Sequence, residues 1–345
     1  MRETNEALRH TGGRNITALR HQWHELLGEG RPRTIAMADG EDPRAINAAV
    51  ALQREGKLVP ALVGDPATIT AHVRALYGEH VAPLRIIDVR QGLGDFAVRT
   101  AIECELAGAT PEIPSSRQSD PLYVSIALLR LGAIDGVVAG ASRPTADVLR
   151  AGLRVLGPAN AVSTVSSCCL MLPPGGRILC YADCSVLPDP DEKQLADIAI
   201  ASAHTFSALT GLTPKVAMLS FSTLGSARAD AARKVRRATE LVWQRDGHLA
   251  VDGEMQFDAA YVSAVGRVKA PHSVIAGQAN VFIFPNLDSA NIATKNTERV
   301  GGALAIGPIL QGLPAPLNDL SRGCDAYDIE LVALVTAVQA ATQVP

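Results

Sequence analysis

Residues 34–66 read TIAMADGEDPRAINAAVALQREGKLVPALVGDP, and this stretch decides the fold class. Thr34–Asp39 is a short apolar run typical of a buried strand. In the turn that follows, Asp42 can cap a helix whose first position is Pro43. The unit then repeats, with a strand predicted over Leu58–Gly64 and a second helix opening at residues 65–66. Strands that alternate with helices at this spacing predict an α/β fold with a parallel sheet.

The same reading extends along the chain in both directions. Strands are predicted over 133–140, 161–172, 177–186, 215–222 and 281–284, and helices over 14–29, 147–156, 227–243 and 326–341, with another opening at 189–192. The change of character after residue 160 predicts a domain junction there. The Gly- and Pro-rich stretch near residue 310 predicts a second junction, where the chain returns. We therefore expect a discontinuous first α/β domain of residues 1–160 and 311–345, and a second α/β domain of residues 161–310.

Composition excludes several classes of protein. The chain has 345 residues, of which 47% are hydrophobic and 19% charged, and a length of this order suggests two domains. A net charge of −3 argues against general electrostatic attachment to nucleic acid or an anionic membrane. Prolines break the longest charge-free stretches, 155–176 and 300–318, and the N-terminus has no apolar signal core. We expect a cytoplasmic protein whose six cysteines are free thiols, with no nucleic-acid or membrane partner.

Most catalytic signatures are missing from the sequence. There is no G-x-x-x-x-G-K-[ST], G-x-G-x-x-G, G-x-S-x-G or H-E-x-x-H pattern. Asp252, Glu254 and Asp258 could offer oxygen ligands to a divalent cation, although solvated or helix-capping roles are favoured. We therefore expect no metal site.

Two loops suit an anionic ligand. Residues 140–147, GASRPTAD, follow a predicted strand, and Arg150 lies in the next helical turn. Small residues, a helix N-terminus and an arginine favour phosphate binding. In the alternative interpretation Asp147 is only a cap and Arg150 only a surface charge. Residues 220–226, SFSTLGS, repeat this design before a basic helix.

A third segment, NDLSRGCDAYD at 318–328, crowds polar residues between two apolar stretches. Asp325 and Asp328 have capping-box spacing, and Arg322 could be structural. Charged groups in such a place are costly without a partner, so the segment is also a candidate site.

The chain resembles the phosphate acetyl/butyryltransferase family, which includes the phosphotransacetylases. The resemblance lies in NDLSRGCDAYDI, AIGPILQGL, QANVFIFPNL, DGVVAGASRPTADVLR, VAMLSFSTLGSA and DGEMQFDAA, and it covers nearly everything from Arg33 onward. It implies reversible acetyl transfer between acetyl phosphate and coenzyme A, with CoA as substrate, no cofactor and no metal in the chemical step. It also implies two α/β domains with an interdomain cleft, of isocitrate/isopropylmalate dehydrogenase-like architecture, in a homodimer of acetate metabolism. Longer members carry N-terminal regulatory domains, which we do not expect in this protein.

The resemblance also implies roles for individual residues. Asp328 would be the general base for the CoA thiol, Arg322 would bind the acyl phosphate, and Ser321 would hydrogen-bond the reacting centre. The phosphate and acyl side would be lined by Arg150, Thr145, Ser226 and Lys295.

The sequence departs from the family at several positions. Phe221 replaces a frequent Tyr, Pro144 a usual Ser or Thr, and residues 151–152 alter the usual LRPAL. Cys104 stands where members have an arginine that is implicated in CoA binding, which predicts weak CoA binding unless another cation substitutes. Three alternatives stay open: a butyryl- or propionyltransferase, a dehydrogenase with a nicotinamide and a metal, and a weakened paralogue with a binding role.

Overall fold

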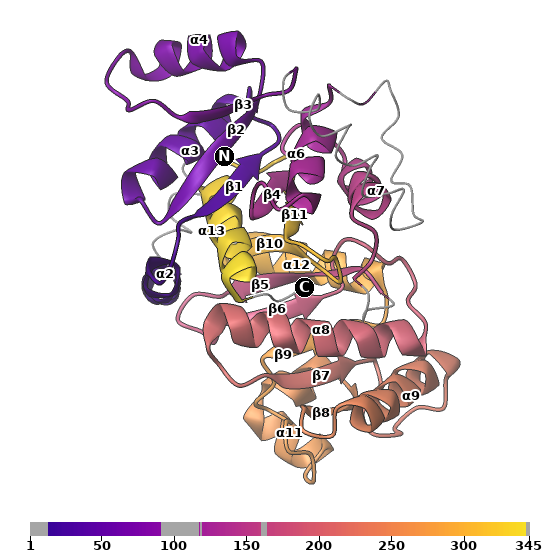
Figure 1. The fold of residues 1–345 in the computed structure, drawn as a ribbon. Coiled ribbons are helices and arrows are strands. Elements are labelled where there is room, and N and C mark those ends of the chain that lie inside the picture. The colour runs from indigo at the N-terminus through magenta and orange to yellow at the C-terminus, as the bar shows by residue number, and fades with distance from the viewer. Residues whose placement is uncertain (1–12, 91–116, 118, 160–163, 343–345) are drawn as a thin grey trace. The chain divides into compact units, whose positions relative to one another are not determined.

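The computed structural model describes residues 13–90, 117, 119–159 and 164–342 (Figure 1). The chain divides into two compact units, each built around one sheet. The five-stranded unit comprises Gln22–Ala159 with Leu313–Gln343, and the six-stranded unit comprises Asn160–Gly312 with the chain before Gln22. Both units are α/β, so the predicted fold class is confirmed.

The sheet of the five-stranded unit is parallel throughout, with the order β11-β4-β1-β2-β3. Its strands are β1 (Arg33–Met37), β2 (Leu58–Gly64), β3 (Arg85–Asp88), β4 (Gly136–Ala139) and β11 (Leu317–Asp319). The strand predicted over Leu58–Gly64 is confirmed to the residue. The strand predicted at 34–39 is confirmed as β1, which begins one residue earlier and ends two residues earlier, and the strand predicted at 133–140 is confirmed with shorter bounds. The sequence did not indicate β3 or β11.

Helices cover both faces of this sheet. Helices α3 (Pro43–Glu55) and α13 (Ala326–Thr342) pack together against one face, and α6 (Pro121–Arg130) and α7 (Thr145–Val155) against the other (Figure 1). Helix α4 (Pro66–Tyr77) packs beside β2 and β3, and α2 (Gly13–Gly28) is the predicted N-terminal helix. Asp42 and Asp65 cap α3 and α4, and each is followed by a proline, as predicted.

The sheet of the six-stranded unit is mixed, with the order β10-β5-β6-β9-β7-β8. Its strands are β5 (Ser166–Leu172), β6 (Leu179–Ala182), β7 (Lys215–Leu219), β8 (Ala250–Met255), β9 (Val281–Ile283) and β10 (Leu304–Gln311). Helices α8 (Glu192–Thr210), α9 (Asp230–Arg245) and α12 (Leu287–Arg299) contact its strands, and the short α10 (Phe257–Tyr261) and α11 (Ser263–Lys269) pack together. The β6–β9, β7–β9 and β7–β8 pairs are parallel, whereas β10–β5 and β5–β6 are antiparallel.

Strand β10 lies where the sequence predicted only a connecting stretch. It contains Gly307 and Pro308, which normally argue against a strand. The strand tolerates them because it is at the edge of the sheet and its register shifts between Ile306 and Ile309.

Helix α13 is apolar almost all round, and its residues from Ile329 to Gln339 are buried, as predicted. In the part of the chain that the structure describes, no helix has the length and apolar character needed to cross a bilayer.

Candidate active site

Three loops meet at one edge of the five-stranded sheet, because β1, β4 and β11 are parallel neighbours. Met37 pairs with Val138 and Ala139 pairs with Asp319, so the three strands end at nearly the same level. In open α/β sheets, ligands bind outside the carboxyl ends of the strands. The segments that follow these strands carry Thr145, Arg150, Ser321, Arg322 and Asp328.

The 320–325 turn leaves β11 and presents two of the predicted residues. The Leu320 amide donates to the Ala139 carbonyl at 2.8 Å, and the Cys324 amide donates to the Ser321 carbonyl at 2.9 Å. These bonds close the turn, and Ser321 and Arg322 lie exposed at its tip. The structure therefore places both side chains where a ligand can reach them.

Asp328 lies in the first turn of α13 and takes part in the helix cap. One of its carboxylate oxygens accepts from the Asp325 amide at 2.9 Å, and Asp325 in return accepts from the Tyr327 and Asp328 amides at 2.9 and 3.1 Å. The capping interpretation of the Asp325–Asp328 spacing is thus confirmed. A capping bond at one oxygen is compatible with a base role for the carboxylate, which stays a prediction.

Arg44, on α3, holds the 320–325 turn in place. One of its terminal nitrogens donates to the carbonyls of Arg322 and Cys324, each at 3.0 Å. The other donates to the Ala141 carbonyl at 2.8 Å and to Asp42 at 2.7 Å. A single guanidinium therefore connects two of the three loops.

The sequence did not point to Arg44 as a functional residue, although it contains one signal. Arg44 is a cation in the first turn of a helix, where the helix dipole disfavours positive charge. Such a residue needs compensating partners, and the carbonyls of two distant loops provide them.

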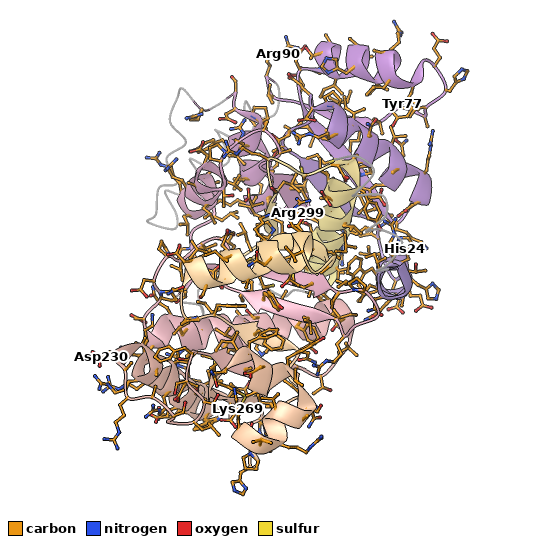
Figure 2. The ribbon with its side chains drawn as sticks, turned by 180° about the vertical axis from the view of Figure 1, so that it is seen from behind. His24, Tyr77, Arg90, Asp230, Lys269 and Arg299 are labelled. Carbon is orange, nitrogen blue, oxygen red and sulfur yellow. The ribbon has the colours of Figure 1, made fainter. Side chains whose placement is uncertain are left out.

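We expect Arg44→Met to lower the free energy of unfolding by about 2–3 kcal/mol, because it leaves carbonyls of both loops without their charged donor. Denaturant unfolding of the purified variant measures the change. Arg90→Met is the matched control, since Arg90 makes its ion pairs with a side chain that is 67% exposed (Figure 2). Equal loss in the two variants would contradict the role of Arg44.

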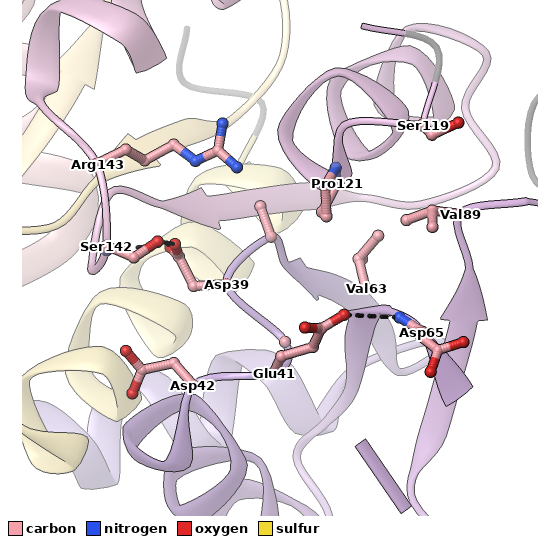
Figure 3. Close-up of a pocket in the computed structure, with 12 residues that line it drawn as sticks. Asp39, Glu41, Asp42, Val63, Asp65, Val89, Ser119, Pro121, Ser142 and Arg143 are labelled. Atoms are coloured by element: carbon pink, nitrogen blue, oxygen red, sulfur yellow. Dashed lines mark hydrogen bonds between the residues drawn. The ribbon is translucent and has the colours of Figure 1, made fainter. Parts of the chain in front are cut away.

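Asp39, just after β1, anchors the 140–147 loop. Its carboxylate accepts from the Gly140 and Ala141 amides at 2.9 and 3.1 Å and from the Ser142 hydroxyl (Figure 3). It also faces a pocket of about 490 Å³, whose other charged lining residues are Glu41, Asp42, Asp65 and Arg143. The sequence predicted Asp39 only as the last residue of a strand, at the start of a turn. Its role as an anchor depends on the pairing of β1 with β4, which a single sequence does not reveal.

Asp319, the last residue of β11, is fully buried. It accepts a hydrogen bond of 2.5 Å from the hydroxyl of Thr145, at the start of α7. Burial raises the pKa of Asp319 to about 7, against the effect of the Thr145 bond, and the nearby charge of Asp39 adds to the rise. Thr145 is therefore held in place by a carboxyl group that can exchange a proton near neutral pH.

Arg150 lies on the exposed side of α7. Its side chain is 63% exposed and pairs with Asp147 at 2.6 Å. Pro144, not Asp147, is the N-cap residue, so the predicted capping role of Asp147 is wrong. A surface ion pair of this kind contributes little to stability, which leaves Arg150 free to exchange partners.

Ser226 belongs to the six-stranded unit, in the loop after β7. Its hydroxyl accepts from the Thr223 amide at 3.0 Å and lies 3.2 Å from the Ser222 hydroxyl. The loop is fixed by Glu254, which accepts from Ser222 at 2.8 Å and from the Gly225 amide at 2.9 Å and pairs with Arg236 at 3.0 Å. Burial alone would raise the pKa of Glu254, but Arg236 and these donors hold it below its usual value.

Lys295 lies on α12 and pairs with Glu298 at 3.4 Å, with 53% of its side chain exposed. Within the described residues, the hydrogen bonds do not link Lys295 to Ser226. Its predicted role in ligand binding stays a prediction.

The three acidic residues considered as metal ligands have other partners. Glu254 pairs with Arg236, and Asp258 pairs with Lys269 at 2.8 Å. The Asp252 side chain accepts from the Gly253 amide at 2.8 Å. Over the described ranges, no three His, Cys, Asp or Glu side chains form a group that could hold a metal ion.

The cysteines of the described chain are buried free thiols, as predicted: Cys168, Cys169, Cys180, Cys184 and Cys324. Cys324 lies in the candidate site, where burial raises its pKa to about 12 against the effect of Arg44. It is therefore protonated at neutral pH and is a poor nucleophile. Cys104 lies outside the described residues, so the weak CoA binding expected from it stays a prediction.

Together these groups can bind an anion and accept a proton. An exposed arginine and serine on a fixed turn, a carboxylate at the start of a helix and a hydroxyl on the next loop form a set suited to group transfer from a phosphate.

Comparison with known proteins identifies relatives over almost the whole chain. A family model described as phosphate acetyl/butaryl transferase matches residues 22–337. The phosphate acetyltransferase of Acetivibrio thermocellus is 41% identical over 317 residues, which cover 89% of this chain and 94% of that protein.

Solved structures agree with the sequence comparison. A phosphotransacetylase from Streptococcus pyogenes has a TM-score of 0.86 at 38% identity, over 94% of this chain and 98% of that one. A chain from Salmonella typhimurium described as a 4-hydroxythreonine-4-phosphate dehydrogenase has a TM-score of 0.55 at 12% identity, over 90% of this chain and 100% of that one. The second likeness extends to the fold alone.

Proposed function

Since the chain belongs to the phosphate acetyl/butyryltransferase family, it is an acyltransferase, and we propose that Asp328, Arg322 and Ser321 carry its reaction. The reaction is the reversible transfer of acetyl between acetyl phosphate and coenzyme A. The observation that most supports this assignment of residues is the 320–325 turn, which Arg44 holds in place and which exposes Ser321 and Arg322 shortly before Asp328 in the chain.

Asp328 would take the proton of the CoA thiol. A free thiol has a pKa of about 8.5 and an aspartate about 3.9, so the transfer is uphill by about 6 kcal/mol before the site acts on it. The positive charge of Arg322 favours the thiolate, and a partly desolvated carboxylate is a stronger base. Both effects reduce the difference between the pKa of the thiol and that of the carboxyl group.

Arg322 and Ser321 would bind the acyl phosphate. Attack by the thiolate places negative charge on the carbonyl oxygen, and each fixed donor at that oxygen is worth about 3–4 kcal/mol. Thr145, the first residue of α7, and Arg150, in the second turn of this helix, would bind the phosphate group, because the amides at a helix N-terminus favour an anion. The ligand-binding roles that the resemblance implies for Ser226 and Lys295 are part of the same proposal.

The acetyl group would pass directly to the CoA sulfur. A covalent acyl-enzyme needs a protein nucleophile, and the thiol of Cys324 is protonated because of its raised pKa. The collapse of the tetrahedral intermediate then breaks the bond between the carbonyl carbon and the phosphate oxygen and releases phosphate.

The finer points follow from the family resemblance. We propose that the protein acts in the cytoplasm, in acetate metabolism, and that it forms a homodimer. We also propose that the two compact units of each chain are its two domains. Its small-molecule partners would be CoA, acetyl phosphate and phosphate. Transfer of butyryl or propionyl groups is the second candidate, because the family description includes a butyryl activity and Phe221 is 61% exposed in the loop that carries Ser226.

The function is tested by following thioester absorbance with purified protein, CoA and acetyl, propionyl or butyryl phosphate, with and without EDTA. We expect product to form fastest from acetyl phosphate and at the same rate with EDTA. Turnover that depends on a nicotinamide, or a clear preference for butyryl phosphate, would contradict the proposal.

A further inference from the structure

The proposed mechanism gives no role to Asp319, a buried carboxyl group at the end of β11. Asp319 is fully buried, and its only hydrogen-bonded side-chain partner among the described residues is the Thr145 hydroxyl, at 2.5 Å. Its second oxygen, Oδ1, is buried and has no hydrogen-bond partner within the described part of the chain. Leaving a charged oxygen buried and unpaired is costly, so this environment favours the neutral form of the side chain.

The backbone of Gly140 lies close against Oδ1 of Asp319. Gly140 has a φ of +109°, and a Cβ at this position would collide with Oδ1 and with the backbone of Leu320. The Gly140 amide itself points to Asp39 and donates to it at 2.9 Å. Asp39 therefore accepts from the amides of this loop, whereas Asp319 accepts from the Thr145 hydroxyl, with the Leu320 amide nearby opposing the rise of its pKa. A hydroxyl, unlike an amide, can also accept a hydrogen bond from a protonated Asp319.

Few charged residues lie on the elements that pack around Asp319. The negative charge of Asp39, after β1, adds to the effect of burial in raising the pKa of Asp319 to about 7. Strand β4, which pairs with β11, has no titratable side chain. The helices packed against β11 bring the following charged residues: Asp147, Arg150 and Arg154 on α7, and Asp328 and Glu330 on α13.

We propose that Asp319 is a positioning residue that decides whether the Thr145 hydroxyl donates or accepts a hydrogen bond toward the bound phosphate group. This inference rests on the phosphate-binding role proposed for Thr145. An ionised Asp319 can only accept a hydrogen bond, so the Thr145 hydroxyl donates to it. The lone pairs of the Thr145 oxygen then face the ligand. A neutral Asp319 donates its own proton to the Thr145 oxygen, and the hydroxyl proton is then free to bind a phosphate oxygen.

Anion binding is thereby linked to the uptake of one proton by Asp319. The neutral carboxyl group predominates below pH 7 or so and is lost as the pH rises through that value. Binding of a dianion should therefore weaken with rising pH, although the arginines of the site stay charged throughout.

Sulfate is a suitable probe, because it remains a dianion over this range and needs no catalysis to be detected. Isothermal titration calorimetry should show sulfate binding to the wild-type protein about 10-fold more weakly at about pH 8.5 than at about pH 6. Repeating the titration in buffers of different ionisation enthalpy should show the uptake of nearly one proton at the higher pH. Displacement by acetyl phosphate identifies the site.

Three variants separate this linkage from a merely structural effect. In Asp319→Asn the amide always donates to Thr145, so sulfate should bind with the affinity of the low-pH wild type, with no proton uptake and no dependence on pH. Thr145→Val should also give a flat profile, but with weak binding, and Thr145→Ser should restore the wild-type profile.

A wild-type profile that is flat, or one that Asp319→Asn leaves unchanged, would overturn the inference. Failure of the proposed function would be seen separately, as a lack of thioester product from acetyl phosphate and CoA. The calorimetric result stands in either case.

Discussion

Asp328→Asn is expected to lower kcat by about 10²–10³-fold at neutral pH, the range found when a general base is lost. The KM for acetyl phosphate should change little. In the wild-type protein the Asp325 amide donates to the Asp328 carboxylate at 2.9 Å. The side-chain oxygen of an asparagine at this position can accept the same hydrogen bond. The substitution therefore removes the base and keeps the helix cap, so loss of folding should not contribute to the result.

The pH profile gives this prediction a second readout. Without a base, the reaction depends on thiolate that forms in solution, so the activity of the variant should rise with pH toward the thiol pKa of about 8.5. Asp325→Asn is the matched control, because it alters the other member of the same cap and should leave kcat nearly unchanged. Near-normal turnover in Asp328→Asn would reduce Asp328 to a capping residue.

Arg322→Ala is expected to lower kcat/KM for acetyl phosphate by about 10²–10³-fold, as when a fixed donor to a developing oxyanion is removed. The backbone carbonyl of Arg322, and not its side chain, binds Arg44, so the turn should keep its conformation. Arg322→Lys should retain part of the activity, since lysine keeps the charge but not the planar pair of donors.

Steady-state kinetics of the two variants, with added guanidinium ion, measures this role. Guanidinium should partly restore the alanine variant, because it can occupy the vacated space. Arg299→Ala is the control, as Arg299 is 56% exposed and pairs with Glu298 on its own helix. Full activity in the lysine variant would show that only charge, and not bidentate geometry, is needed.

The sequence predicts the elements that local rules determine. Asp42 and Asp65 each precede a proline and cap a helix, and Leu58–Gly64 is apolar throughout because helices cover the sheet on both faces. These features depend on neighbours within a few residues, so a single chain reveals them. Strand β10 is the opposite case, because Gly307 and Pro308 are tolerated there only at a sheet edge with a shifted register.

The candidate site could be predicted only in part, because some of its contacts join residues that are far apart in the sequence. Crowded polar residues at 318–328 implied that a partner was needed, and the partner is Arg44, which lies 278 positions from Arg322 in the sequence. Asp319 belongs to this segment, but the segment does not reveal its burial or its bond to Thr145, because both arise from the pairing of β11 with β4. Contacts of this range depend on the strand order of the sheet, which the pattern of residues does not specify.

The exchange of radiolabelled phosphate into acetyl phosphate tests direct transfer to the CoA sulfur most sharply. Acetyl phosphate and labelled phosphate are incubated with the purified protein, and the label in acetyl phosphate is measured with and without CoA. Direct transfer predicts exchange only when CoA is present, because acetyl-CoA must form before phosphate can attack. Exchange without CoA would reveal an acyl-enzyme and contradict direct transfer, and no exchange with CoA would contradict the acetyltransferase function itself.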